Sequence, residues 1–313
     1  MSEKLKQAVL KKEREILKEL GCELSAVNSD KEYPDSYYKG FEYNLFEKMG
    51  SDHKIQYGEG SGGELEAKHG KRYSPAKMAS IRSSSAMTFN LLGNNQVYIN
   101  VDNGLGHSAG KYHVVYEKQI TTIESSGRQA PANLDAFLVS EDGTELIFCE
   151  MKMMEWFDKN KSDLKEAYTD RSNYPHKNLY EQFMKAREVI QALYKHGDFT
   201  HYDVWQMFKH TLAVHNYVAD HAWDNIRKVT LVNVVFEPTA EAIDEVVRNE
   251  YVEQLAMEHK GFEQFRFALY EAGLIEVAGK NFDVKYLSSR EFMDCFDITD
   301  ERRRYLKRYT FEE

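Results

Sequence analysis

Cysteine is scarce in this sequence, with only Cys22, Cys149 and Cys295 among 313 residues. Their number is odd, and they lie far apart without C-x-x-C spacing, which argues against a disulfide framework. A reducing cytoplasm is therefore the setting that we expect.

Long apolar runs are also missing. No stretch of about 18 apolar residues exists, so no transmembrane helix is predicted. The start, Met-Ser-Glu-Lys-Leu-Lys, has no apolar core of the kind that signal peptides carry. We expect a soluble, cytoplasmic protein without a membrane partner.

Several common binding motifs are absent as well. The 11 histidines never show H-x-x-x-H, H-x-x-H or H-E-x-x-H spacing, so a zinc site is unsupported. The glycines of residues 58–63 precede Glu64 rather than the Lys-Ser/Thr pair of a phosphate loop. The glycines of residues 104–109 precede a strand-like segment, whereas a dinucleotide fingerprint requires a helix there.

Positive charge is in deficit, since the net charge is −10. Coating of a nucleic-acid backbone needs local positive charge, so this balance argues weakly against generic binding. It remains compatible with a basic groove at one cleft.

Hydrophobic residues make up 42% of the chain and aromatic residues 13%, which suffices for a sizeable core. With no internal repeat and no clear linker, we predict one domain over residues 1–313. Within it we expect an N-terminal helix plus long polar loop (1–82), a core (83–240) and a mostly helical extension (241–313).

Periodicity predicts individual elements. Strands are indicated at 97–101, 113–120, 229–236 and 282–287, and helices at 2–20, 83–92, 178–194, 201–221 and 239–272. Residues 28–74 read as a long loop or lid. A last helix, 300–309, interleaves arginine with tyrosine, which suits either a solvated face or contact with nucleic acid.

The most informative stretch runs from Asn133 to Phe157. Asp142-Gly143 separates two runs of apolar residues, which is a strong hairpin signal. If these two residues form the loop, opposite positions sum to 285. Asp135 then lies opposite Glu150, and strand alternation puts Lys152 on the same face as Glu150.

Two carboxylates that face each other repel unless something neutralises them. A hard divalent cation is the obvious partner, because Mg²⁺ favours carboxylate oxygens. An ordinary ion pair on a hairpin face is the alternative. The apolar residues on both sides of Glu150 favour the functional interpretation, because a charge in a buried strand is costly.

Asp135, fourteen residues, then Glu150-x-Lys152 across a hairpin resembles the active site of the PD-(D/E)XK, or restriction-endonuclease-like, nucleases. Leu134 replaces the proline of the family's name. The resemblance implies an α/β fold with a restriction-endonuclease-like core, a mixed central sheet flanked by helices, and helical additions at both ends.

The resemblance also implies a Mg²⁺-dependent endonuclease, a phosphodiester hydrolase, with Mn²⁺ as a substitute. Asp135 and Glu150 would be metal ligands, with the Met151 main-chain carbonyl as a third. Lys152 would orient or deprotonate the attacking water, or neutralise charge. Candidates for supporting roles are Glu117, Glu124, Glu155 and Gln206.

The expected partner is nucleic acid, with DNA expected before RNA, and a homodimer is plausible by analogy. The basic stretch before the hairpin and the helix after it supply candidate backbone contacts: Lys71, Arg72, Lys77, Arg82 and Lys209. RNA cleavage, and a nucleic-acid-binding or scaffold protein without turnover, stay open as alternatives.

Overall fold

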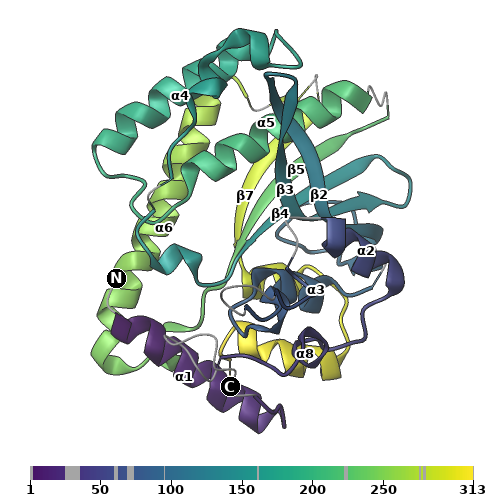
Figure 1. The fold of residues 1–313 in the computed structure, drawn as a ribbon, viewed down its shortest axis with the longest axis vertical. Coiled ribbons are helices and arrows are strands. Elements are labelled where there is room, and N and C mark those ends of the chain that lie inside the picture. The colour runs from purple at the N-terminus through teal and green to yellow at the C-terminus, as the bar shows by residue number, and fades with distance from the viewer. Residues whose placement is uncertain are drawn as a thin grey trace.

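The computed structural model describes residues 3–24, 36–59, 63–68, 74–94, 96–160, 162–221, 225–274, 276–277 and 280–312. Within these ranges a seven-stranded sheet has the order β1-β2-β3-β4-β5-β7-β6. Strands β1 to β4 are antiparallel neighbours, whereas β4, β5 and β7 are parallel. Helices flank this mixed sheet, so the predicted α/β class is confirmed (Figure 1).

The strands are β1 (Gln96–Ile99), β2 (Gly110–Ser125), β3 (Arg128–Ser140), β4 (Glu145–Lys152), β5 (Lys228–Val235), β6 (Glu276–Val277) and β7 (Lys280–Ser288). The α-helices are α1 (Glu3–Glu19), α2 (Ser51–Glu59), α3 (Ser84–Leu92), α4 (Tyr180–Lys195), α5 (Val204–His221), α6 (Glu245–Glu271), α7 (Ser289–Asp294) and α8 (Asp300–Leu306). No helix in the described ranges is long and apolar enough to cross a membrane.

The central strands carry apolar residues on both faces. In β4 every residue except Lys152 is buried, as expected for a strand covered on both sides. Ile147 and Cys149 pack into a core shared with α1 and α3, while Leu146 and Phe148 pack into a second core with α4 and α5. The period-2 alternation of the strand therefore divides the molecule into two apolar layers.

The β3–β4 hairpin has the predicted register, since Ala136 pairs with Cys149 and Leu138 with Ile147. The connection is longer than the predicted two-residue loop, because neither Glu141 nor Thr144 belongs to a strand. The Asp142 carboxylate accepts hydrogen bonds from the Thr144 backbone N–H and hydroxyl, which closes the turn locally.

The predicted long loop at 28–74 is wrong in part. Helix α2 lies within it, and Met49 and Tyr57 are buried in the core shared with α1. The polar composition of the segment concealed these few apolar anchors. The stretch 25–35 lies outside the described residues.

The basic C-terminal tail also differs from expectation. Arg308 is fully buried, and its guanidinium donates to Glu13 at 2.9 Å and to Asn44 Oδ1 at 2.7 Å. The rings of Tyr305 and Tyr309 lie 5.6 and 4.9 Å from it. For Arg308, both the solvated face and the nucleic-acid contact are therefore wrong, since this side chain holds the fold together.

Candidate functional site

Acidic side chains from three neighbouring strands form a row across the sheet. The pairs Tyr116–Ala136 and Lys118–Leu134 place Glu117 of β2 opposite Asp135 of β3. The hairpin register continues from Ala136–Cys149, which places Asp135 beside Glu150 of β4. Glu117 has a φ of 49°, a left-handed conformation within the otherwise extended strand β2.

Glu150 and Lys152 are held together by Gln206 of α5. The Lys152 ammonium lies 2.8 Å from Glu150 Oε1 and also donates to Gln206 Oε1. The Gln206 amide nitrogen donates to Glu150 Oε1 at 2.7 Å. His210, one helical turn further along α5, brings its Nε2 to 3.0 Å from Glu150 Oε2.

The Glu150–Lys152 pair is ionised. Burial alone would raise the pKa of Glu150, but the Lys152 ammonium and His210 outweigh it and lower that pKa to about 2. Burial would lower the pKa of Lys152, yet the Glu150 carboxylate outweighs it and raises that pKa. A protonated lysine can donate hydrogen bonds and supply positive charge, but it cannot accept a proton at neutral pH.

The other two acids lack such a partner. Burial, followed by the charges of Glu150 and Glu117, raises the pKa of Asp135 well above its usual range, although the Met151 N–H donates to Asp135 Oδ2 at 2.7 Å. Burial and the neighbouring Glu64 raise the pKa of Glu117 to about 7. The site therefore has more carboxyl groups than its own cations can keep ionised.

This excess of oxygen donors fits a hard divalent cation. Mg²⁺ is usually bound by one or two carboxylates and keeps several waters. Asp135 and Glu150 supply two such carboxylates. Among the described residues, no group of three or more acidic, histidine or cysteine side chains is arranged to hold a metal ion. A cation here would rely on these two acids, a main-chain carbonyl and water.

A family model described as restriction endonuclease associating with ARP matches residues 8–271. That range covers well over half of the chain and includes the whole row of acids. The chain belongs to this restriction endonuclease family. The search of the curated proteins and the search of the solved structures found no match to this chain.

The supporting residues expected of a restriction endonuclease fall into two groups. Glu117 and Gln206 lie at the site, as described above. Glu155 follows Lys152 closely, and its carboxylate accepts the Met153 N–H at 2.7 Å. Glu124 does not join them, because it lies near the β2–β3 turn, where its carboxylate accepts from Gln129 at 3.2 Å.

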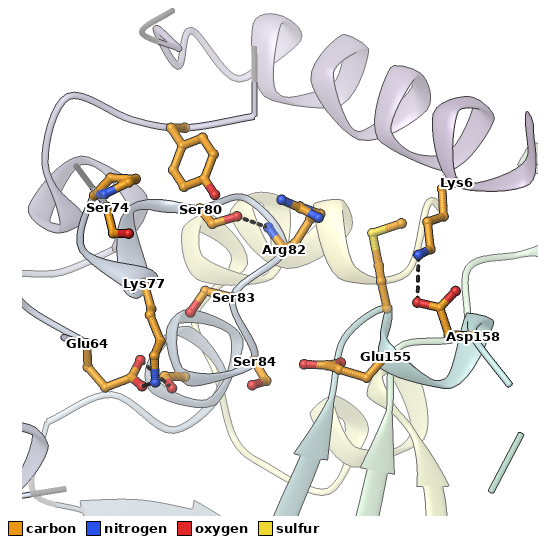
Figure 2. Close-up of a pocket in the computed structure, with 14 residues that line it drawn as sticks. Lys6, Glu64, Ser74, Lys77, Ser80, Arg82, Ser83, Ser84, Glu155 and Asp158 are labelled. Carbon is orange, nitrogen blue, oxygen red and sulfur yellow. Dashed lines mark hydrogen bonds and ion pairs between the residues drawn. The ribbon is translucent and has the colours of Figure 1, made fainter. Parts of the chain in front are cut away.

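Lys77, one of the candidate backbone contacts, lines a pocket of about 650 Å³ that Glu155 also lines. Figure 2 shows the Lys77–Glu64 pair on one side of this pocket and the Lys6–Asp158 pair on the other, each at 2.6 Å. Arg82 lines the pocket too. Lys209 is half-buried on α5, and Lys71 and Arg72 lie outside the described residues.

Four residues at the site were not predicted. His210 lies four positions after Gln206, so helical spacing alone would have placed both on one face. Asn233 pairs with Glu150 across β4 and β5, and that parallel register is invisible in sequence. Glu64 and Glu258 come from segments far away in the chain, and no local pattern marks either of them.

Proposed function

We propose that this protein is a Mg²⁺-dependent endonuclease that hydrolyses phosphodiester bonds in DNA. The observation that supports this most is the row of Glu117, Asp135 and Glu150 next to a lysine that Gln206 fixes in place. Membership of a restriction endonuclease family agrees with it. We propose DNA rather than RNA as the substrate only because the family is described as a restriction endonuclease.

Asp135, Glu150 and the Met151 carbonyl would hold the metal, with Glu117 as a further acid beside them. Bound Mg²⁺, or Mn²⁺ in its place, supplies Lewis acidity to the scissile phosphate and lowers the pKa of a bound water. The raised pKa of Asp135 supports this assignment, because a buried carboxylate next to two others is stabilised by a cation.

Lys152 would donate to the phosphate or to the attacking water and offset the charge that develops in the transition state. Of the roles that the resemblance allows, proton abstraction fits least, because Glu150 keeps Lys152 protonated. Gln206 would keep the ammonium and the Glu150 carboxylate at a fixed separation, so that neither reorients as the substrate arrives.

A cleavage assay tests the proposal. Purified protein is incubated with Mg²⁺ or Mn²⁺ and with linear, circular, branched and single-stranded DNA, and separately with RNA. We expect cleavage of DNA that EDTA abolishes, and loss of roughly 100-fold or more in Asp135→Asn and Lys152→Ala.

Glu188→Gln, an exposed change on α4, is the matched control and should cleave as the wild type does. Cleavage that survives in both site variants would place the activity elsewhere. Binding of DNA without cleavage by the wild type, unchanged in Lys152→Ala, would favour a binding or scaffold protein. Cleavage of RNA alone would correct the substrate.

A further inference from the structure

A second, smaller pocket lies beside Lys152. It has a volume of about 190 Å³, and its lining includes Asp203 and Met207 of α5, Asn233 of β5 and Glu258 of α6. Lys152 itself lines it as well. The pocket therefore lies next to the proposed catalytic lysine and is bordered by elements that follow the hairpin in the chain.

Three residues that line this pocket carry buried polar atoms without a hydrogen-bond partner in the described part of the chain: Glu258 Oε2, Asn233 Oδ1 and the Tyr202 hydroxyl. Their exposed fractions are 1%, 2% and 0%. Buried polar groups are costly when unpaired, and ordered water commonly pairs them. At about 190 Å³, the pocket is large enough to hold ordered water.

One N–H group of the Lys152 ammonium also has no partner among the described residues. A lysine ammonium has three N–H groups. Glu150 Oε1 and Gln206 Oε1 account for two of them, and the described residues offer no partner for the third. Burial raises the pKa of Glu258 to about 8, and the nearby Lys152 charge opposes that rise, so the two side chains interact.

We propose that Glu258 is a positioning residue for Lys152, acting through water bound in this pocket. Water accepts the third N–H of the ammonium and donates to Glu258, with Asn233 and Tyr202 completing the water's partners. Lys152 is then fixed from two sides. The proposal rests on the nuclease function above for its effect on catalysis, but the hydrogen-bonded link itself does not depend on that function.

Two substitutions of equal length separate the hydrogen bond from the packing. Glu258→Met removes the acceptor, and Glu258→Gln keeps one. With DNA and Mg²⁺, we expect kcat to fall roughly 10- to 100-fold in Glu258→Met with KM nearly unchanged, as when a supporting residue around a metal site is lost. Glu258→Gln should retain most of the wild-type kcat.

The melting temperature distinguishes positioning from a purely structural role. Replacing this buried acid by an apolar side chain of equal length should leave Tm unchanged or raise it, because residues kept for function often cost stability. Glu253→Met, an exposed change on the same helix, is the control and should leave kcat unchanged. Wild-type kcat in Glu258→Met, equal losses in the Met and Gln variants, or a fall in Tm that accompanies the lost activity would each overturn the proposal.

High-resolution crystal structures of the wild type and of Glu258→Met give a readout that needs no activity. We expect ordered water between Lys152 Nζ and Glu258 in the wild type, and a displaced Lys152 side chain in the variant. A dry pocket, or an unmoved ammonium, would overturn the proposal even if DNA is cleaved. A wild type that cleaves nothing but shows both features would refute only the nuclease function.

Discussion

At the scale of single residues, a buried histidine makes this fold sensitive to acid. His107 Nδ1 lies 2.8 Å from Glu145 Oε2, and burial lowers the pKa of His107 to about 4. Burial alone would raise the pKa of Glu145, but hydrogen bonds from Ser108 and Tyr112 outweigh it and lower that pKa to about 2. His107 is therefore neutral and donates to an ionised Glu145.

Both shifts act in the same direction. As pH falls below 6.5, His107 becomes protonated in the unfolded chain, whereas in the folded chain it stays neutral down to about pH 4. As pH falls below 4.5, Glu145 becomes protonated in the unfolded chain, whereas in the folded chain it stays ionised down to about pH 2. The contribution of this pair to stability should thus fall as pH falls from 6.5, by at most ~1.4 kcal/mol per pH unit for each group, while the raised pKa values of Glu117 and Glu258 contribute in the opposite direction. Urea denaturation between pH 7 and pH 4 measures this.

His107→Gln removes one of the titrating groups, so the free energy of unfolding of the wild type minus that of the variant should fall as pH falls from 6.5 to 4. His215, whose pKa burial also lowers to about 4, is present in both proteins and cancels in that difference. An unchanged slope in His107→Gln would show that this histidine titrates normally in the folded protein.

Only some residues of the candidate site could be predicted from the sequence. Asp135, Glu150 and Lys152 share one hairpin, so strand alternation alone brings them together. Gln206 was a candidate only through the family resemblance. Glu258 of α6 lines the same pocket as Lys152 and Asn233, and no pattern in the residues next to Glu258 in sequence predicts that proximity.

At the scale of elements, the hairpin turn depends on one glycine. Gly143 has a φ of +71°, and a Cβ placed there would meet no atom within 4 Å. Gly143→Ala should therefore cost roughly 1–2 kcal/mol through backbone strain alone. A chemical denaturation curve gives the change.

Gly58 of α2 offers the opposite case. A Cβ there also meets no atom within 4 Å, but the backbone is helical. Gly58→Ala should stabilise the protein by roughly 0.5–1 kcal/mol. Equal effects of the two substitutions would contradict the argument from backbone conformation.

Elements were predictable wherever periodicity was strong. Helices α4 and α5 and strand β5 lie close to their predicted ranges, because each pairs a regular apolar pattern with clear ends. Strand β2 extends beyond its predicted range, 113–120, at both ends. Helix α2 was missed because its few anchors are spread through polar residues. The position of β7 beside β5 follows from long-range pairing, which no local pattern encodes.

At the scale of the whole molecule, one buried ion pair joins segments from opposite ends of the chain. Arg308 and Glu13 are both 0% exposed, and their side chains meet at 2.9 Å. Arg308→Met should cost about 3–5 kcal/mol, since it leaves a buried carboxylate unpaired. Adding Glu13→Met should restore most of that loss, because a matched apolar pair removes the unpaired charge.

Arg303 provides the control for that prediction. It pairs with Asp294 at 2.7 Å, but the two side chains are 41% and 51% exposed. Arg303→Met should change the free energy of unfolding by about 1 kcal/mol or less. A similar cost for both arginines would show that burial does not set the strength of the Arg308 pair.

The parallel pairing of β5 with β7 has a consequence for how the protein is made. A ribosome releases β4 and β5 well before β7, so the edge of β5 that β7 will cover stays open while more than forty residues are added. Glu258, which we propose to position Lys152, also emerges in that interval. The site is thus incomplete when the hairpin that bears Asp135, Glu150 and Lys152 first emerges, and its last side chains arrive only once α6 has been synthesised.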